Sequence, residues 1–239
     1  DGFLTRGAKT LPIAAPLAEE PPGTEPVLAL DGDGSYVELP PNIFDGLTEA
    51  TVEGWVKWDR FEGDSRFFDF GAMWQAMTVS QVESTGDLRF EIWEPERKQH
   101  ELRVANQLRR KEWTHVAAVS GPDGAKLYFN GNLVASNSFT GSFASVKNGQ
   151  QNYLGRNNWK PEMAWIRDFQ GQMDEVRVWK IVGTAAEIRA NRFAKLTGRE
   201  PGLVGYWNFD DGTANDASAG RHHGALQGTF HDLELLVLG

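Results

Sequence analysis

Aromatic, amide and guanidinium side chains lie close together in the segment GRNNWKPEMAW, residues 155–165. An indole face can stack on the C–H face of a sugar ring, while amides and a guanidinium bond to hydroxyl groups or to a carboxylate at its rim. This composition predicts a ligand-binding rim, with the candidate residues Trp74, Arg156, Asn157, Asn158 and Trp159. The alternative is that these tryptophans only cover the ends of a large fold, because tryptophans are commonly highly but not fully buried.

Catalytic arrangements are scarce in the sequence. A glycoside hydrolase needs two carboxylates that face one bond, whereas Glu91 and Glu94 are three residues apart and fall on opposite faces of a regular strand. His222 and His223 are adjacent rather than at a metal-ligand spacing. The sequence has no cysteine, no G-x-S-x-G motif and no phosphate-binding loop. These observations favour a protein that is not an enzyme.

The elements that position these residues are short and rich in β-branched and aromatic residues, with turn residues between them. Asn130-Gly131, between two alternating segments, predicts a type I′ β-hairpin. One helix breaks the pattern, because Thr184 and Glu187 have the spacing of a capping box. The sequence therefore predicts an all-β fold, a two-sheet antiparallel β-sandwich with one short helix near the C-terminal end.

Composition excludes several classes of partner. The chain has 33 acidic and 24 basic residues, a net charge of −9, which would repel a nucleic-acid backbone. It has no run of about 18 apolar residues, so no membrane span is predicted. Residues 1–26 are rich in Pro, Ala and Glu and predict a linker or an extended N-terminal strap, with the globular part at 27–239.

Several motifs, in their order along the chain, resemble the laminin-G-like, concanavalin A-like lectin/glucanase jelly-roll domains of bacterial surface proteins. The resemblance runs from about Val27 to Asn191 and is carried by LALDGDGSYVELP, ATVEGWVKW, EWTHVAAVSGPDGAKLYFNGNLVAS, NYLGRNNW and FQGQMDEVRVWKIVGTAAEIRAN. The segment GLVGYWNFDDGTANDASAGRHHGAL also resembles the family but stands late in this chain. Either 202–239 completes the sandwich in permuted order, or it begins a second repeat.

The resemblance implies a structural calcium ion, with Asp31, Asp33 and Asp174 at the matching positions. Calcium prefers six to eight oxygen ligands, which a glycine-containing acidic loop can supply. The alternative is that Asp31 and Asp33 simply form an Asx turn. Strict alternation would put Asp174 on the inward face with Val176 and Val178, where a carboxylate needs a partner.

These observations together predict a non-catalytic extracellular carbohydrate-binding or adhesion module with a calcium-stabilised scaffold. Its expected location is extracellular, at the cell surface or in the periplasm, as part of a larger multidomain protein. The expected partner is a glycan or a partner protein. Two alternatives stay open, namely a protein-recognition or sensor module of a larger surface protein and, less favoured, a diverged glycoside hydrolase.

Overall fold

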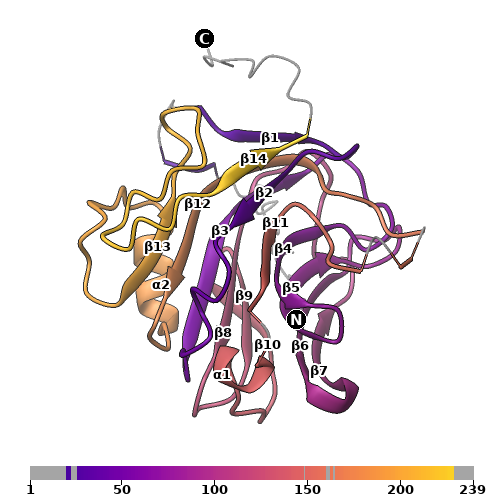
Figure 1. Cartoon of the computed structure of the whole chain (residues 1–239), viewed down its shortest axis with the longest axis vertical. Coiled ribbons are helices and arrows are strands. Elements are labelled where there is room, and N and C mark those ends of the chain that lie inside the picture. The colour runs from indigo at the N-terminus through magenta and orange to yellow at the C-terminus, as the bar shows by residue number, and fades with distance from the viewer. Residues whose placement is uncertain (1–19, 23–25, 148, 160–161, 164, 229–239) are drawn as a thin grey trace, which may run out of the picture.

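A computed structural model shows two antiparallel seven-stranded sheets packed face to face (Figure 1). It describes residues 20–22, 26–147, 149–159, 162–163 and 165–228, so most of the predicted linker 1–26 lies outside the described residues. Sheet A contains, in spatial order, β1 (Leu28–Asp31), β12 (Gln170–Trp179), β3 (Ala50–Trp58), β8 (Thr114–Ser120), β9 (Lys126–Phe129) and β10 (Asn132–Ser136), with β13 (Leu203–Trp207) also paired to β12. Sheet B contains β14 (Ala225–Gln227), β2 (Tyr36–Leu39), β11 (Gln151–Leu154), β4 (Arg66–Ala72), β5 (Gln75–Gln81), β6 (Leu88–Glu94) and β7 (Lys98–Val104).

This architecture confirms the predicted two-sheet β-sandwich. The core lies between the sheets, where residues at every second position of a strand are buried, as the period of a strand requires. Sheet A contributes Val52 and Val56, and sheet B contributes Phe68, Phe70 and Phe90, all at most 1% exposed. Two short helices, α1 (Phe143–Val146) and α2 (Ala185–Asn191), and a 3-10 turn at Pro95–Arg97 complete the described elements.

The predicted hairpin joins β9 to β10. Asn130 and Gly131 both have positive φ, 48° and 74°, as a type I′ turn requires. A Cβ atom at Gly131 would lie 3.1 Å from the Cα atom of Arg189, so the turn packs directly against α2. The turn therefore needs glycine both for its backbone conformation and for its contact with the helix.

Helix α2 covers the outer face of sheet A. It begins with the predicted capping box, in which Thr184 accepts from the Glu187 amide and Glu187 accepts from the Thr184 amide. Ile188 is buried against Ala117, Val119 and Tyr128 of that face. Two side chains of sheet A donate hydrogen bonds to carbonyl groups at the C-terminal end of this helix. Trp55 Nε1 donates to Arg192 O at 2.7 Å, and Arg177 donates to Asn191 O at 2.7 Å.

The described part of segment 202–239 adds an edge strand to each sheet. β13 pairs with β12 through Val176–Trp179, beyond the stretch of β12 that pairs with β1. β14 pairs with β2, with Ala225 opposite Glu38. Both described strands of this segment thus pair with strands of the same sandwich. No helix among the described residues is long and apolar enough to cross a membrane.

Candidate ligand-binding surface

The five predicted rim residues do not form one site. The chain leaves β11 at Leu154 and folds back over the outer face of sheet B. There Asn158 donates from its backbone amide to Asp69 Oδ2 at 3.1 Å and from Nδ2 to Asp69 Oδ1 at 2.9 Å. Asn157 is fully buried and Asn158 is 7% exposed. Both side chains point into the protein, where Asn158 binds Asp69 and Asn157 accepts from the Trp159 amide, so they hold the loop in place.

Trp74 and Trp159 meet Trp93 in a tryptophan cluster (Trp74, Trp93 and Trp159). The ring centroids of Trp74 and Trp159 are 4.4 Å apart, and Trp93 lies 5.1 Å from Trp74 and 5.4 Å from Trp159. Trp93 and Trp159 are each 8% exposed, and the Arg97 guanidinium lies 4.8 Å above the half-buried Trp74 ring. For Trp93 and Trp159 the structure favours the alternative reading, in which the indoles cover the fold.

Buried charges lie beneath this cluster on the outer face of sheet B. Arg66 contacts Glu91 at 3.2 Å and Asp69 at 3.6 Å, and all three side chains are at most 2% exposed. Burial raises the pKa of Asp69, against the opposing effects of Arg66 and of the hydrogen bonds from Asn158. Glu94 instead bonds to His100 at 2.9 Å, so the two glutamates considered for catalysis take part in separate contacts.

A second group of aromatic residues lies beside the loop and is more accessible. Tyr36 of β2 and Tyr153 of β11 meet edge to face, with ring centroids 5.3 Å apart and an interplanar angle of 76°. The Arg156 guanidinium lies 4.4 Å above the Tyr36 ring and 6.0 Å from the Tyr153 ring. All three side chains are half-buried. We call these three residues the tyrosine surface.

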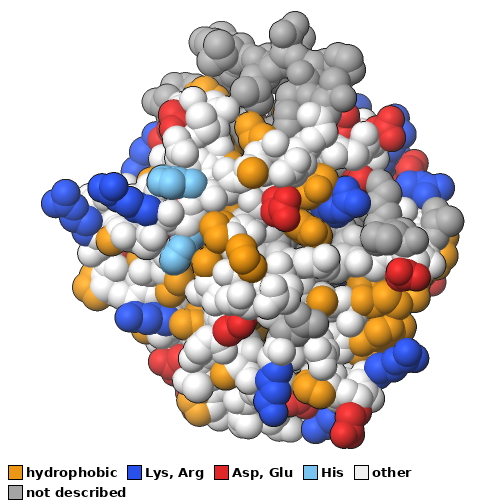
Figure 2. All heavy atoms as spheres, viewed as in Figure 1, with side chains coloured by type: hydrophobic (Ala, Val, Ile, Leu, Met, Phe, Trp, Pro, Cys, Tyr) orange, Lys and Arg blue, Asp and Glu red, His pale blue; other side chains and the backbone are white. Residues whose placement is uncertain are grey.

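Polar groups border the tyrosine surface. Exposed Glu38 stands opposite Tyr153 in the β2–β11 ladder and accepts a hydrogen bond of 3.1 Å from Gln227 of β14. Burial raises the pKa of Tyr153, and neighbouring Glu38 and Tyr36 act in the same direction. Figure 2 shows hydrophobic side chains beside acidic and basic ones near the centre of this face, over β2 and β11. The surface thus combines ring faces with donors and acceptors.

Sequence reasoning found only Arg156 of this surface. Alternation does place Tyr36 and Tyr153 on the face opposite Val37 and Leu154, which are buried in the core. The missing information is that β2 and β11 are neighbours, since 114 residues separate Leu39 from Tyr153 in the chain. Only the sheet order brings the two tyrosines together.

The three carboxylates of the predicted calcium site do not meet. Asp31 stands opposite Gln170 in the β1–β12 ladder, four residues before Asp174. At a rise of about 3.4 Å per residue, this separates the two positions by about 14 Å. Carboxylates that share one calcium ion, each at about 2.3–2.6 Å from it, lie far closer together. The predicted set therefore does not form one site.

Asp31 and Asp33 instead show the turn that was the alternative reading. Asp31 Oδ1 accepts from the amide of Asp33 at 2.8 Å and from the Ser35 hydroxyl at 2.5 Å. Against the opposing effect of burial, these hydrogen bonds lower the pKa of Asp31. The loop borders a polar cavity of about 420 Å³, whose lining also contains the cations of Arg60 and Arg167. Among the described residues, no group of three or more His, Cys, Asp or Glu is arranged to hold a metal ion.

Asp174 faces the opposite side of sheet A from the one that alternation predicts. A β-bulge places Asp174 opposite Trp55 and Arg177 opposite Glu53, so β12 has one residue more than β3 in this interval. The additional residue is Glu175, with φ 52°. Asp174 consequently lies on the outer face with Trp55, where it is 5% exposed, while Val176 and Val178 stay in the core. Burial, with neighbouring Glu175, raises the pKa of Asp174 to about 8.

Comparison with known proteins places the fold. Among solved structures, a Bacteroides ovatus protein described as a candidate carbohydrate-binding protein is 20% identical, with a TM-score of 0.60 over 83% of this chain and 59% of its own length. The CBM40 module of a Ruminococcus gnavus intramolecular trans-sialidase, bound to α2,3-sialyllactose, is 14% identical, with a TM-score of 0.59 over 71% of this chain and 97% of its own.

Domain 4 of an extracellular arabinanase from Geobacillus stearothermophilus, in complex with arabinotriose, is 20% identical, with a TM-score of 0.52 over 70% of this chain and 76% of its own. These likenesses show a common fold. No curated protein sequence matches the chain. The family model of the concanavalin A-like lectin/glucanases superfamily matches residues 31–189, which is more than half of the chain. The chain belongs to this superfamily, as its motifs predicted.

Proposed function

We propose that the protein is a non-catalytic carbohydrate-binding module that recognises a glycan at the tyrosine surface. The observation that carries this proposal is the half-buried Tyr36–Tyr153 pair with the Arg156 guanidinium beside it. Three solved relatives of the same fold, two of them in complex with sugars, support it. We further propose a location outside the cytoplasm, as for the extracellular arabinanase. We also propose a place within a larger protein, as for the arabinanase domain and the sialidase module.

The chemistry of the surface suits a sugar. Phenol rings offer apolar faces for the C–H groups of a pyranose or furanose, and their hydroxyl groups remain free to bond at the edge. Arg156 supplies several N–H donors in a fixed plane, and Glu38 supplies acceptors for hydroxyl protons. Calcium has no part in this proposal, because the carboxylates that were predicted to bind it lie apart.

The test is binding to a panel of oligosaccharides, followed by calorimetric titration of the best ligand with three variants. Loss of one stacking ring or of one charged donor removes about 1–2 kcal/mol of binding energy, so Tyr153→Ala and Arg156→Ala should each weaken binding about tenfold. Trp74→Ala is the matched control, because Trp74 is a half-buried aromatic residue outside the tyrosine surface, also stacked under an arginine.

Two results would contradict the proposal at different levels. If Trp74→Ala abolishes binding and Tyr153→Ala leaves it unchanged, the protein binds sugars at the tryptophan cluster instead. If no oligosaccharide binds, carbohydrate recognition itself is refuted. A protein-recognition role would then be favoured by the exposed apolar side chains of Trp165 and Leu133, which are 54% and 51% exposed.

A further inference from the structure

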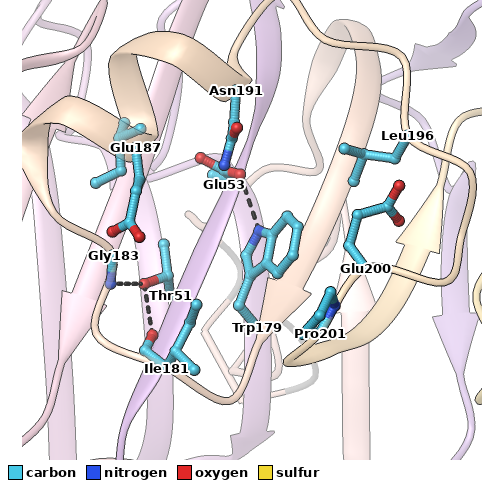
Figure 3. Close-up of a pocket in the computed structure, with 11 residues that line it drawn as sticks. Thr51, Glu53, Trp179, Ile181, Gly183, Glu187, Asn191, Leu196, Glu200 and Pro201 are labelled. Carbon is cyan, nitrogen blue, oxygen red and sulfur yellow. Dashed lines mark hydrogen bonds between the residues drawn. The ribbon is translucent and has the colours of Figure 1, made fainter.

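A cavity of about 190 Å³ lies between helix α2 and the outer face of sheet A, on the opposite side of the sandwich from the tyrosine surface. Its floor is formed by buried Thr51 and Glu53 of β3 and Trp179 of β12. Its rim is formed by the exposed residues Ile181, Glu187 and Pro201. Figure 3 shows the Trp179 indole between the side chains of Glu53 and Glu200. The cavity is thus open at one side and built on a rigid sheet.

The lining of this cavity is acidic. Three carboxylates, those of Glu53, Glu187 and Glu200, contribute to it, and no Lys or Arg is among the described residues that line it. Hydrogen bonds from Thr184 lower the pKa of Glu187. At Glu200, burial acts to raise the pKa, but hydrogen bonds from Thr197 outweigh it and the pKa is lowered. Both groups are therefore ionised at neutral pH, and the cavity attracts a cation.

Two of these carboxylates have an oxygen atom without a hydrogen bond. Glu53 is 1% exposed, and its Oε1 accepts from Trp179 Nε1 at 2.9 Å. Its Oε2, and likewise Oε2 of Glu200, has no hydrogen-bond donor among the described residues although each atom is buried. A buried carboxylate oxygen that lacks a donor is costly, so a donor that enters the cavity would be stabilised there.

The neighbouring cation does not fully compensate Glu53. Arg177 forms its direct ion pair with Glu175 through Nη2, while its Nη1 lies 3.9 Å from Glu53 Oε1 and donates to Asn191 O. His115, 3.6 Å from Glu53 Oε2, is held neutral, because burial and the charges of Arg177 and Arg192 lower its pKa well below the usual value. Burial raises the pKa of Glu53, against the opposing effects of Arg177 and of the hydrogen bond from Trp179, so a cation in the cavity would stabilise the charged form of this group.

Apart from Thr51 and Asn191, the rest of the lining is largely apolar. The indole of Trp179 and the side chains of Ile188, Leu196 and Pro201 surround the acidic groups. An aromatic face also attracts an ammonium group. A ligand that matches both features carries its charge at the end of an aliphatic stem, which packs against the apolar wall while the charged end reaches the floor.

We propose that this cavity binds a primary ammonium group on a short aliphatic stem. Two sources share this chemistry, a free alkylamine and the side chain of a lysine residue on a partner protein. The site is separate from the tyrosine surface, so it does not depend on the proposed recognition of glycans.

The test is a titration of the full chain with n-pentylammonium, monitored through the NMR signal of the Trp179 indole N–H. This signal is assigned by its absence from the spectrum of Trp179→Phe. Pentan-1-ol, which has the same stem without the charge, is the control ligand. We expect millimolar binding of the amine, at least about tenfold weaker binding of the alcohol, and weaker binding at high salt, because Coulomb attraction in a partly open site is screened. No shift of this signal, or equal binding of amine and alcohol, would overturn the proposal.

Variants localise the effect. Glu200→Gln and Glu187→Gln should each weaken amine binding about two- to fivefold, as expected for partly exposed ion pairs. Glutamine preserves the capping box at position 187, so the helix should keep its fold. Glu112→Gln, an exposed carboxylate before β8, is the charge-matched control and should leave binding unchanged. If it weakens binding as much as Glu200→Gln does, the attraction is a general effect of the negative net charge and the site is refuted.

A third comparison separates the two sources. Nα-acetyl-lysine-methylamide presents the same ammonium group on a peptide backbone. If it binds at least as tightly as n-pentylammonium, a lysine of a partner protein is the favoured occupant. If only the free amine binds, the rim excludes a peptide backbone and a small amine is the ligand.

Discussion

Replacing Asp174 by asparagine should stabilise the protein at neutral pH. Asp174 is 5% exposed, and its pKa is raised to about 8 by burial and by neighbouring Glu175 and Asp210. The folded state therefore keeps this group protonated at pH values where the unfolded chain, in which an aspartate has its ordinary pKa of 3.8, has released the proton. Asparagine has nearly the same shape and no charge to bury.

The sign and size follow from linkage. Because the folded pKa is raised, the contribution of Asp174 to stability is fully present below pH 3.8 and is lost as the pH rises toward about 8. Each pH unit in this window costs about 1.4 kcal/mol, which gives about 4 kcal/mol at pH 7 as an upper limit. Relaxation and water penetration reduce this value, so we expect Asp174→Asn to stabilise by about 2–4 kcal/mol at pH 7. At about 2–4 °C per kcal/mol, the midpoint should rise by about 4–16 °C.

The assay is thermal and urea unfolding of both proteins at pH 4, 5.5, 7 and 8.5, with calcium and with a chelator in parallel. The difference in the free energy of unfolding between Asp174→Asn and the parent protein should be small at pH 4, grow with pH and level off above pH 8. Exposed Asp123→Asn is the control and should show no such trend. If Asp174→Asn destabilises the protein at pH 7, or removes a stabilisation that calcium confers, then the carboxylate has a cationic partner and the reasoning fails.

Two further substitutions test how loops and helix are held. Asn158→Ala keeps the backbone amide but removes the Nδ2 donor to the buried Asp69, so it should destabilise by about 2–3 kcal/mol. Urea unfolding measures this, and a loss below about 0.5 kcal/mol would contradict the anchoring role. Thr184→Ala removes the capping box of α2 and should cost about 1 kcal/mol. Thr184→Ser, which retains the hydroxyl group, should recover most of that loss, and failure to do so would show that the cap matters little.

Local patterns in the sequence predict most of the fold. The Asn130-Gly131 turn and the Thr184 capping box are both found as expected. Each depends on residues close together in the chain, where steric rules and periodicity act directly. The match of motifs to the family supported the two-sheet sandwich, but it did not give the order of the strands within each sheet.

The candidate site was harder to predict, for two physical reasons. One is long-range pairing, because Tyr36 and Tyr153 become neighbours only through the β2–β11 ladder. The other is the bulge at Glu175. One extra residue in β12 shifts the alternation of the side chains that precede it, so Asp174 lies on the outer face of the sheet instead of in the core. Composition likewise could not show that the amides of Asn157 and Asn158 point inward, because the same residues suit a rim and an anchor.

The pairing of β14 with β2 has a consequence for how the chain folds. Ala225 and Glu38 are strand partners although 187 positions separate them in the chain. β13, which pairs with the edge of β12, follows α2 in the sequence and is therefore synthesised after it. Contacts of such long range carry a large loop-closure cost and slow folding. During synthesis, the outer edges of β2 and of the second half of β12 stay unpaired until these last strands leave the ribosome. The sandwich therefore forms late rather than strand by strand, and its unpaired edges are the places where a nascent chain is most open to wrong pairing.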